Sequence, residues 1–367
     1  MRVVVGAVTA AVLVTAASAP VIAAEEKILN VYNRSDYIAP ETVEKFVAET
    51  GIKVNYDVYD SNEALEAKLL AGNSGYDLVV SLAGPFLARQ VKAKIYRKID
   101  KAKLKNYDNL DKEILASLAV ADPENTYGVP YLWGTTGFGY NVAKIKAALG
   151  DRAPLDSLAM IFDADIAKKL APCGISLLDS PLEVFPAVLA YLGRSPRSKE
   201  PADLEAAIAA IAKIRPFIKK LHSSQYVNDL ANGDLCISLG YSDDIVQVKM
   251  RAAEAKNGIE IAYSIPKEGA QLSITVMAIP ANAAHPDNAH RFIDFILRPE
   301  TIAAITNAMG YPNPNTLATD MIDDDIRNDR SVYPPDDLRA KFFIDKPATA
   351  DYERARTRAW AKVKSGS

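Results

Sequence analysis

ILNVYNRSDYIAPETVEKFVAETG, residues 28–51, joins a short apolar run to a polar loop and a helical pattern. The run Ile28–Tyr32 has the length of a buried strand, and the charged and aromatic loop Asn33–Tyr37 follows it. Pro40 suits the first turn of a helix, where its missing N–H costs nothing, and Gly51 ends the pattern. Ligands bind open α/β sheets at the carboxyl ends of strands, so this loop is a candidate site. An ordinary polar connector is the alternative.

The same alternation continues through the first hundred residues. Ile52–Tyr59 alternates like a strand, Asn62–Ala71 has helical spacing, and Tyr76–Val80 again has the composition of a buried strand. Three βα alternations favour a mainly parallel sheet covered by helices. The loop Ser81–Pro85 is then expected beside the first loop, at the same sheet edge.

Two long extended segments, Val129–Asn141 and Leu272–Pro280, divide the rest of the chain. We interpret them as crossings between two lobes. The sequence therefore predicts an α/β protein with a hinged cleft between two mixed sheets covered by helices. The expected boundaries are 25–136 with 276–322 for one lobe, and 137–275 with 323–367 for the other.

Composition narrows the function classes. The chain has 367 residues, of which 49% are hydrophobic and 24% charged, as in an ordinary globular protein of two domains. The formal net charge is -3 and no long basic run occurs, which argues against nucleic acid as a partner.

Residues 1–24, MRVVVGAVTAAVLVTAASAPVIAA, have the layout of a secretory signal peptide. Arg2 supplies the positive start, Val3–Ala17 the apolar core and Ala23-Ala24 the small-residue exit, so cleavage is expected after about Ala24. An uncleaved membrane anchor is the weaker alternative. No cysteine stands at the exit to carry a lipid anchor. The sequence therefore predicts that the mature chain is exported.

Cysteine and histidine are scarce. Cys173 and Cys236 are the two cysteines, and export makes a disulfide plausible, with two buried free thiols as the alternative. The three histidines, His222, His285 and His290, show no metal-ligand spacing, and there is no nucleophile elbow. The sequence therefore predicts no catalytic residue, no metal and no cofactor.

Several stretches along nearly the whole mature chain match the pattern of a known family. They are Ser35–Pro40, Tyr76–Val80, Thr135–Asn141, His222–Tyr226, Asn228–Asp234, Ser264–Ala270, Arg356–Trp360 and Lys362–Gly366. In these stretches the chain resembles the putrescine- and spermidine-binding periplasmic proteins of ABC importers, and most closely the putrescine-binding type. The resemblance implies a two-lobed type II periplasmic binding fold, delivery of a linear amine to a permease, and a disulfide between the two cysteines. A monomer is expected.

An alkyl diammonium needs carboxylates at its ends and aromatic walls along its methylenes, because aromatic faces attract cations. Buried carboxylates also favour the closed, liganded state, since without a cation they are costly. The resemblance implies site roles for a set drawn from both lobes. Its members are Ser35, Asp36, Tyr37, Glu183, Tyr241, Asp244 and Tyr311.

Three positions depart from the putrescine-type pattern. Arg34 stands where the family has Trp, Ser273 where it has Phe, and Thr275 where it has an amine-binding Asp. An Arg repels an ammonium and pairs with carboxylates. These changes favour an alternative ligand, a linear ω-amino acid such as γ-aminobutyrate or 5-aminovalerate. Arg34 turned to solvent, or paired with Asp36, would instead leave a weak polyamine site.

Three function classes follow. The first is a periplasmic binding protein for a polyamine or related linear amine, which works by closing a cleft and then meets the transmembrane subunits of a permease. The second is an enzyme, which the sequence disfavours because adjacent residues such as His222 and Ser223 do not make a catalytic triad. The third is a sensor that binds the same ligand without transport.

Overall fold

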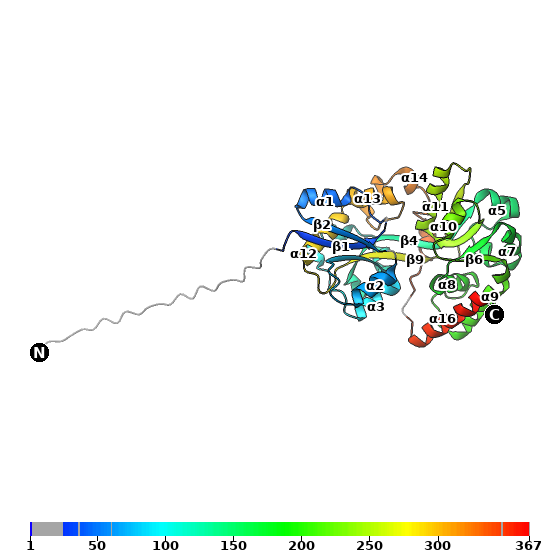
Figure 1. The fold of residues 1–367 in the computed structure, drawn as a ribbon, viewed down its shortest axis with the longest axis horizontal. Helices are drawn as coiled ribbons and strands as arrows, with labels where there is room; N and C mark the ends of the chain where they lie inside the picture. The colour runs from blue at the N-terminus through cyan, green and yellow to red at the C-terminus, as the bar shows by residue number, and fades with distance from the viewer. Residues whose placement is uncertain (2–24, 36, 60, 346–347, 367) are drawn as a thin grey trace.

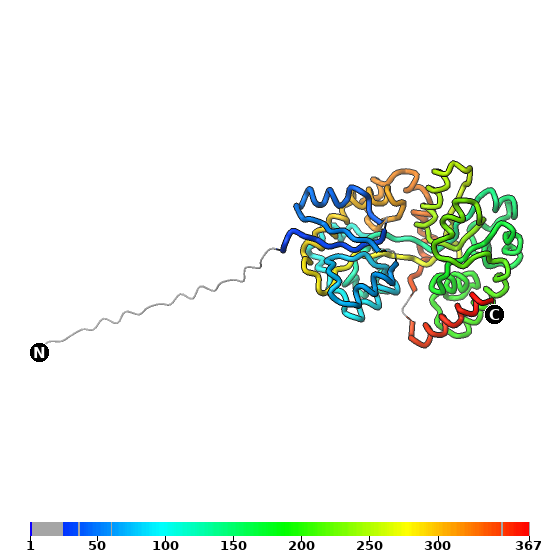
Figure 2. The backbone as a smooth tube through the Cα atoms, in the orientation of Figure 1, coloured from blue at the N-terminus to red at the C-terminus, as the bar shows by residue number. Residues whose placement is uncertain are grey.

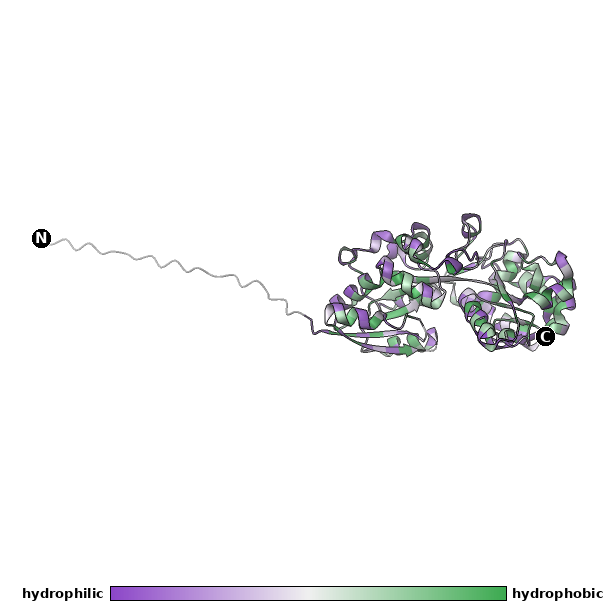
Figure 3. Ribbon diagram, turned by 90° about the horizontal axis from the view of Figure 1, so that it is seen from above, coloured by the Kyte–Doolittle hydropathy of each residue, from purple (hydrophilic) through white to green (hydrophobic). Residues whose placement is uncertain are grey.

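The computed structural model describes residues 1, 25–35, 37–59, 61–345 and 348–366. They form an α/β molecule whose strands run through its middle and whose helices cover them (Figure 1). Seen from above, the helices gather in two bodies joined by extended segments (Figure 3). The predicted α/β class is confirmed.

The described strands form a nine-stranded sheet in the order β2-β1-β3-β9-β4-β7-β5-β6, with β8 on β4. Their bounds are β1 Ile28–Arg34, β2 Lys53–Tyr59, β3 Leu78–Leu82, β4 Gly128–Asn141, β5 Ile175–Leu177, β6 Ile218–Leu221, β7 Ile237–Tyr241, β8 Ile261–Ser264 and β9 Gln271–Ala278. β1 pairs in parallel with β2 and β3, and β5 pairs in parallel with β6 and β7. The two predicted parallel regions are therefore present.

β4 and β9 connect these two regions. β4 pairs antiparallel with β9 from Gly128 to Thr136, and with β7 from Thr136 to Tyr140. The two strands lie side by side through the middle of the molecule (Figure 2). Both crossings are thus where the sequence predicts them. The two sheets of the prediction are instead one continuous sheet, because backbone hydrogen bonds run through both crossing strands.

The α-helices of the described chain flank this sheet. On the side of β1–β3 they are α1 Thr42–Thr50, α2 Asn62–Leu70, α3 Ala88–Lys92, α4 Lys112–Leu118, α12 Pro286–Ile296, α13 Pro299–Met309 and α14 Asp324–Arg327. The remaining helices are α5 Val142–Leu149, α6 Ala159–Phe162, α7 Ala164–Leu170, α8 Pro181–Tyr191, α9 Pro201–Ile214, α10 Tyr226–Ala231, α11 Ser242–Ala255, α15 Asp336–Arg339 and α16 Ala350–Ser365. None of the helices in the described part of the chain is long and apolar enough to cross a membrane.

Buried side chains define two lobes. The first lobe holds two clusters, which draw on residues 29–132 with 277–322 and on residues 59–133 with 272–278 and 344. The second lobe holds one cluster, from residues 138–270 and 359–363. This distribution supports the expected lobe boundaries, which stay a prediction. Leu272, Ile274 and Ile344 pack in the first lobe, although their expected place is in the second.

Two local expectations differ from the structure. α1 begins at Thr42, because Ala39 to Thr42 forms a turn in which the Thr42 N–H bonds the Ala39 carbonyl at 3.1 Å; Pro40 precedes the helix. Ala206–Leu221 has helical spacing in the sequence, which predicts a helix that Pro216 kinks or interrupts, but Ile218–Leu221 is strand β6. Pro216 ends the helical path as its missing N–H requires, and the sheet then provides the partner β5.

The predicted disulfide between Cys173 and Cys236 is confirmed. It ties the residues that precede β5 and β7, two neighbouring strands of the second lobe. The bond lies beside the end of crossing strand β4, because the Asn141 N–H donates to the Cys236 carbonyl at 2.9 Å.

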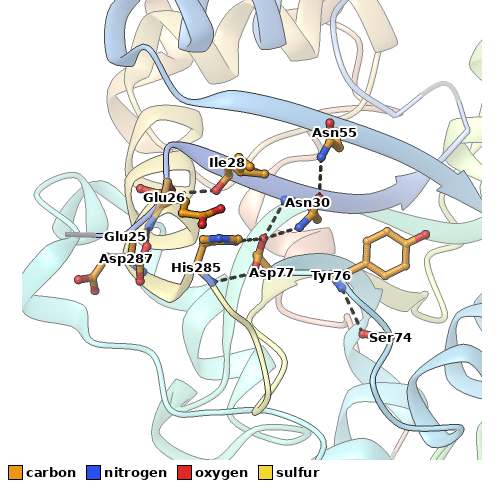
Figure 4. A network of polar contacts seen from close by, with 11 residues as sticks. Glu25, Glu26, Ile28, Asn30, Asn55, Ser74, Tyr76, Asp77, His285 and Asp287 are labelled. Atoms are coloured by element: carbon orange, nitrogen blue, oxygen red, sulfur yellow. Dashed lines mark hydrogen bonds and ion pairs between the residues drawn. The ribbon is translucent and has the colours of Figure 1, made fainter. Parts of the chain in front are cut away.

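A polar network fastens residues 25–30 to α12 (Figure 4). Asp77, which is 1% exposed, accepts hydrogen bonds from Asn30 and from the backbone N–H of His285 at 2.8 Å. Glu25 accepts from the backbone N–H groups of Asp287 and Asn288, both at 2.9 Å. These N–H groups belong to the first turn of α12 and have no partner within the helix. Glu25 thus caps a helix that lies far along the chain.

Candidate ligand-binding cavity

A cavity of about 150 Å³ lies where the two lobes meet. Its walls come from strand ends, from the starts of three helices and from both crossing strands. The lining residues are Arg34, Tyr37, Asn62, Leu82, Trp133, Gly134, Thr135, Glu183, Tyr241, Asp243, Ser273 and Thr275. The carboxyl ends of β1, β3 and β7 therefore meet at one place, as the alternating pattern predicts.

Arg34 is the last residue of β1 and points into this cavity. Its guanidinium carbon lies 4.8 Å from the centre of the Tyr37 ring, in cation–π contact. Its Nη1 lies 3.9 Å from an oxygen of Asp243, which belongs to the second lobe. The side chain is 37% exposed, so this long ion pair is weak. Arg34 therefore faces the cleft, one of the two orientations left open by the sequence.

Aromatic side chains form one wall. Tyr37 packs against Tyr131 and Tyr311, with ring centroids 5.7 and 5.2 Å apart. Its hydroxyl lies 3.3 Å from the Thr275 hydroxyl. The Thr275 hydroxyl in turn donates to the Leu132 carbonyl at 2.9 Å. Thr275 thus holds the two crossing strands and the wall together.

Glu183 supplies a buried carboxylate from the first turn of α8. It is 7% exposed and accepts hydrogen bonds from Thr136 Oγ1 at 2.7 Å and from Gln271 Nε2 at 3.1 Å. Burial raises its pKa to about 7, although the bond from Thr136 acts in the opposite direction. A ligand ammonium would favour the charged form, so this carboxylate is poised for a cation.

Two consecutive aspartates begin α11 and face different spaces. Asp243 lines the cavity, whereas Asp244 lines a neighbouring recess with His222, Gln247 and Arg251. Tyr226 donates to Asp244 at 2.6 Å. Burial and the adjacent charge of Asp243 raise the pKa of Asp244 to about 7.

Six of the expected site residues come together in the cavity: Arg34, Tyr37, Glu183, Tyr241, Ser273 and Thr275. Tyr311 stands behind Tyr37 and accepts a 3.3 Å hydrogen bond from Gln247. Ser35 is not among the lining residues, and Asp36 lies outside the described residues. Asp244 lies apart in its recess.

Sequence reasoning missed half of the lining. Its missed members are Asn62, Leu82, Trp133, Gly134, Thr135 and Asp243. The segment Trp133–Thr135 is aromatic and Gly-rich, and this composition indicates an extended crossing strand without indicating a ligand contact. Gly134 has a packing reason, because a Cβ there would lie 2.9 Å from the Ser242 hydroxyl. Among the described residues no cluster of three or more histidine, cysteine and acidic side chains could hold a metal ion.

Comparison with known proteins places the chain in a family. Residues 41–332 match the bacterial extracellular solute-binding proteins. The chain is 51% identical to the putrescine-binding periplasmic protein SpuD of Pseudomonas aeruginosa, over 94% of each chain. It is 49% identical to the putrescine-binding periplasmic protein PotF of Escherichia coli, over 96% of this chain and 95% of that one.

A solved structure gives the same result at the level of the fold. The spermidine/putrescine ABC transporter substrate-binding protein PotD of Streptococcus pneumoniae superposes with a TM-score of 0.82 at 27% identity, over 93% of this chain and 99% of that one. These relatives are binding proteins of transport systems rather than enzymes, as the sequence predicts for this chain. The chain belongs to the family of bacterial extracellular solute-binding proteins.

Proposed function

We propose that the chain is the periplasmic solute-binding component of a polyamine-type ABC importer. It would trap a linear amine related to putrescine between its lobes and deliver it to the membrane permease. The observation that carries this proposal is the interlobe cavity, which combines two carboxylates with aromatic walls. The two putrescine-binding relatives, at 51% and 49% identity, support the same ligand class.

The cavity chemistry fits a primary ammonium on an alkyl chain. Asp243 and Glu183 offer negative charge on the side of the second lobe. Tyr37, Trp133 and Tyr241 offer aromatic surface for methylenes and for a cation. Because ligand contacts come from both lobes, binding would favour the closed arrangement over more open ones.

Location and partners follow from the same class. The matching relatives are periplasmic proteins, and residues 1–24 would serve as the signal peptide, although they fall largely outside the described residues. The transmembrane subunits of an ABC permease would receive the ligand from a monomer of this chain. Both lobes border the cavity, so the permease would meet a surface that changes on closure.

Thermal shift and calorimetry on the mature chain, residues 25–367, test the proposal. The panel is putrescine, cadaverine, spermidine, γ-aminobutyrate and 5-aminovalerate. A member at a hundred times its Kd is expected to stabilise the protein by about 2.7 kcal/mol. The absence of binding by every member would contradict the proposal.

The Asp243→Asn variant tests the site itself. Loss of the charged hydrogen bond to an ammonium is expected to weaken binding by roughly 1.5–3 kcal/mol. Asp203→Asn is the matched control, since Asp203 also pairs with an arginine in the second lobe but does not line the cavity. Asp244→Asn in the same titration decides whether Asp244 contributes from its recess. Equal affinities for wild type and Asp243→Asn would remove Asp243 from the site.

A further inference from the structure

The two sides of the cavity carry opposite charge. Among the described lining residues, the first lobe contributes one ionisable cation, Arg34, and no carboxylate. The second lobe contributes two carboxylates, those of Glu183 and Asp243. A cavity with this polarity orients a ligand that is itself positive at one end and negative at the other.

Arg34 has hydrogen-bond donors to offer. A guanidinium carries five N–H donors in a planar fork that matches a carboxylate. The nearest described carboxylate oxygen, on Asp243, lies 3.9 Å away, beyond hydrogen-bond distance. Among the described residues, Tyr37 shares a side-chain hydrogen bond with Arg34, and no carboxylate oxygen lies within hydrogen-bond distance of the guanidinium. The Tyr37 ring under the guanidinium holds it in the cavity and leaves the fork available to a ligand.

The start of α2 strengthens the positive side. Asn62 is the first residue of this nine-residue helix and lines the cavity. Its side-chain oxygen accepts from the Leu82 N–H at 3.3 Å. The N-terminal end of a helix carries partial positive charge and favours anions. α11 also begins at the cavity, but Asp243 and Asp244 in its first turn offset its dipole.

We propose that the preferred ligand is a linear amine that ends in a carboxylate, that is, a linear ω-amino acid. Its ammonium would lie toward Asp243 and Glu183, and its carboxylate toward Arg34 and the start of α2. This inference rests on the proposed function, because it names one member of the same ligand class at the same site.

The exchange of partners on binding explains the preference. The ligand ammonium replaces Arg34 beside Asp243, while the ligand carboxylate replaces Asp243 beside Arg34, so every charge keeps a partner. A diamine would place its second ammonium against the guanidinium, where like charges repel. Arg34 is therefore the specificity-determining residue of the cavity.

Matched ligand pairs test the inference by calorimetry on the mature chain. γ-Aminobutyrate is compared with putrescine, and 5-aminovalerate with cadaverine, because each pair has the same number of carbons. Wild type is expected to bind at least one amino acid about 10- to 100-fold more tightly than the matched diamine, the range of a charged hydrogen bond. Arg34→Gln is expected to bind the amino acid no more tightly than the matched diamine, or to bind the diamine more tightly.

Two further variants keep the result interpretable. Arg89→Gln is the matched control, because Arg89 also pairs with a carboxylate and stacks on a ring in the first lobe, yet lies outside the cavity. Arg34→Lys keeps the positive charge but loses the planar fork, so its ratio of amino-acid affinity to diamine affinity should lie between those of wild type and Arg34→Gln. If Arg34→Gln does not fold, Arg34→Lys takes its place in the test.

The outcomes separate the two proposals. Tighter binding of the diamines by wild type, or an unchanged ratio in Arg34→Gln, would overturn the inference and leave the proposed function in place. Failure of these four ligands to bind, with binding of spermidine, would overturn the inference alone. Failure of these four and of spermidine would overturn both proposals.

Discussion

Glu183 couples stability to pH at the scale of one residue. Burial raises its pKa from 4.5 to about 7 in the folded chain. The folded state therefore holds this proton more tightly, and its stabilising effect is complete below about pH 4.5 and lost as the pH rises through 7. We expect Glu183→Gln to be more stable relative to wild type at pH 8 than at pH 5, by roughly 1–3 kcal/mol.

Chemical denaturation at the two pH values measures this difference. Glutamine does not form every hydrogen bond of Glu183, which lowers the stability of the variant at both pH values. This loss therefore cancels when the two pH values are compared. Asp244, whose pKa is also raised to about 7, is present in both proteins and cancels as well. If the difference in free energy of unfolding between Glu183→Gln and wild type is the same at both pH values, ionisation of Glu183 in the folded chain costs little free energy. Ligand affinity should also fall below pH 7, because protonated Glu183 cannot pair with an ammonium.

At the scale of elements, α12 depends on Glu25, a residue far from it in the sequence. Glu25 accepts two backbone N–H groups of its first turn, at Asp287 and Asn288, and places a negative charge at the positive end of the helix. We expect Glu25→Ala to destabilise the first lobe by roughly 0.5–2 kcal/mol, the cost of losing a helix cap. Denaturant titration of both proteins measures this change in the free energy of unfolding.

Glu26→Ala is the control for this cap. The Glu26 backbone carbonyl accepts a hydrogen bond from Asn288, which alanine retains, and the Glu26 side chain is exposed. Its substitution should therefore leave the free energy of unfolding within about 0.5 kcal/mol of wild type, as is usual for surface positions. Equal losses in both variants would show that the contacts of Glu25 do not stabilise α12.

At the scale of the whole molecule, two crossing strands and a few polar contacts join the lobes. The contacts include Arg34 with Asp243 at 3.9 Å and Gln247 with Tyr311 at 3.3 Å. A ligand that contacts both lobes would add to these contacts, so we expect a bound ligand to favour the closed arrangement over more open ones. Small-angle scattering should show a smaller radius of gyration when a ligand of the panel saturates the protein.

The Asp243→Asn variant provides the comparison for closure. At the same ligand concentration it should retain a larger radius, because it loses an ammonium partner on the second lobe. An unchanged radius for wild type, under conditions where calorimetry shows saturation, would mean that the ligand enters a cavity that is already closed. In that case the stabilisation would persist without any change in shape.

Local spacing in the sequence was enough to predict the alternation of strands and helices. Period-2 and helical patterns depend on neighbouring residues, so they identified β1, β2, α2 and both crossing strands with small errors at the ends. The scarcity of cysteine left one possible intramolecular pair, and the structure contains it. The strand-end argument indicated the loop after β1, which contributes Arg34 and Tyr37 to the lining. The other four expected lining residues came from the comparison with the putrescine-binding pattern, because local spacing does not indicate them.

Tertiary structure alone decided which polar groups meet. Consecutive residues of a helix differ in direction by about 100°, so the packing of α11 through the buried Ile245 and Val248 determines that Asp243 faces the cavity and Asp244 the recess. The orientation of Arg34 and the cap of α12 by Glu25 likewise depend on residues far apart in the chain. Such contacts follow from how whole elements pack, and local sequence spacing carries no record of them.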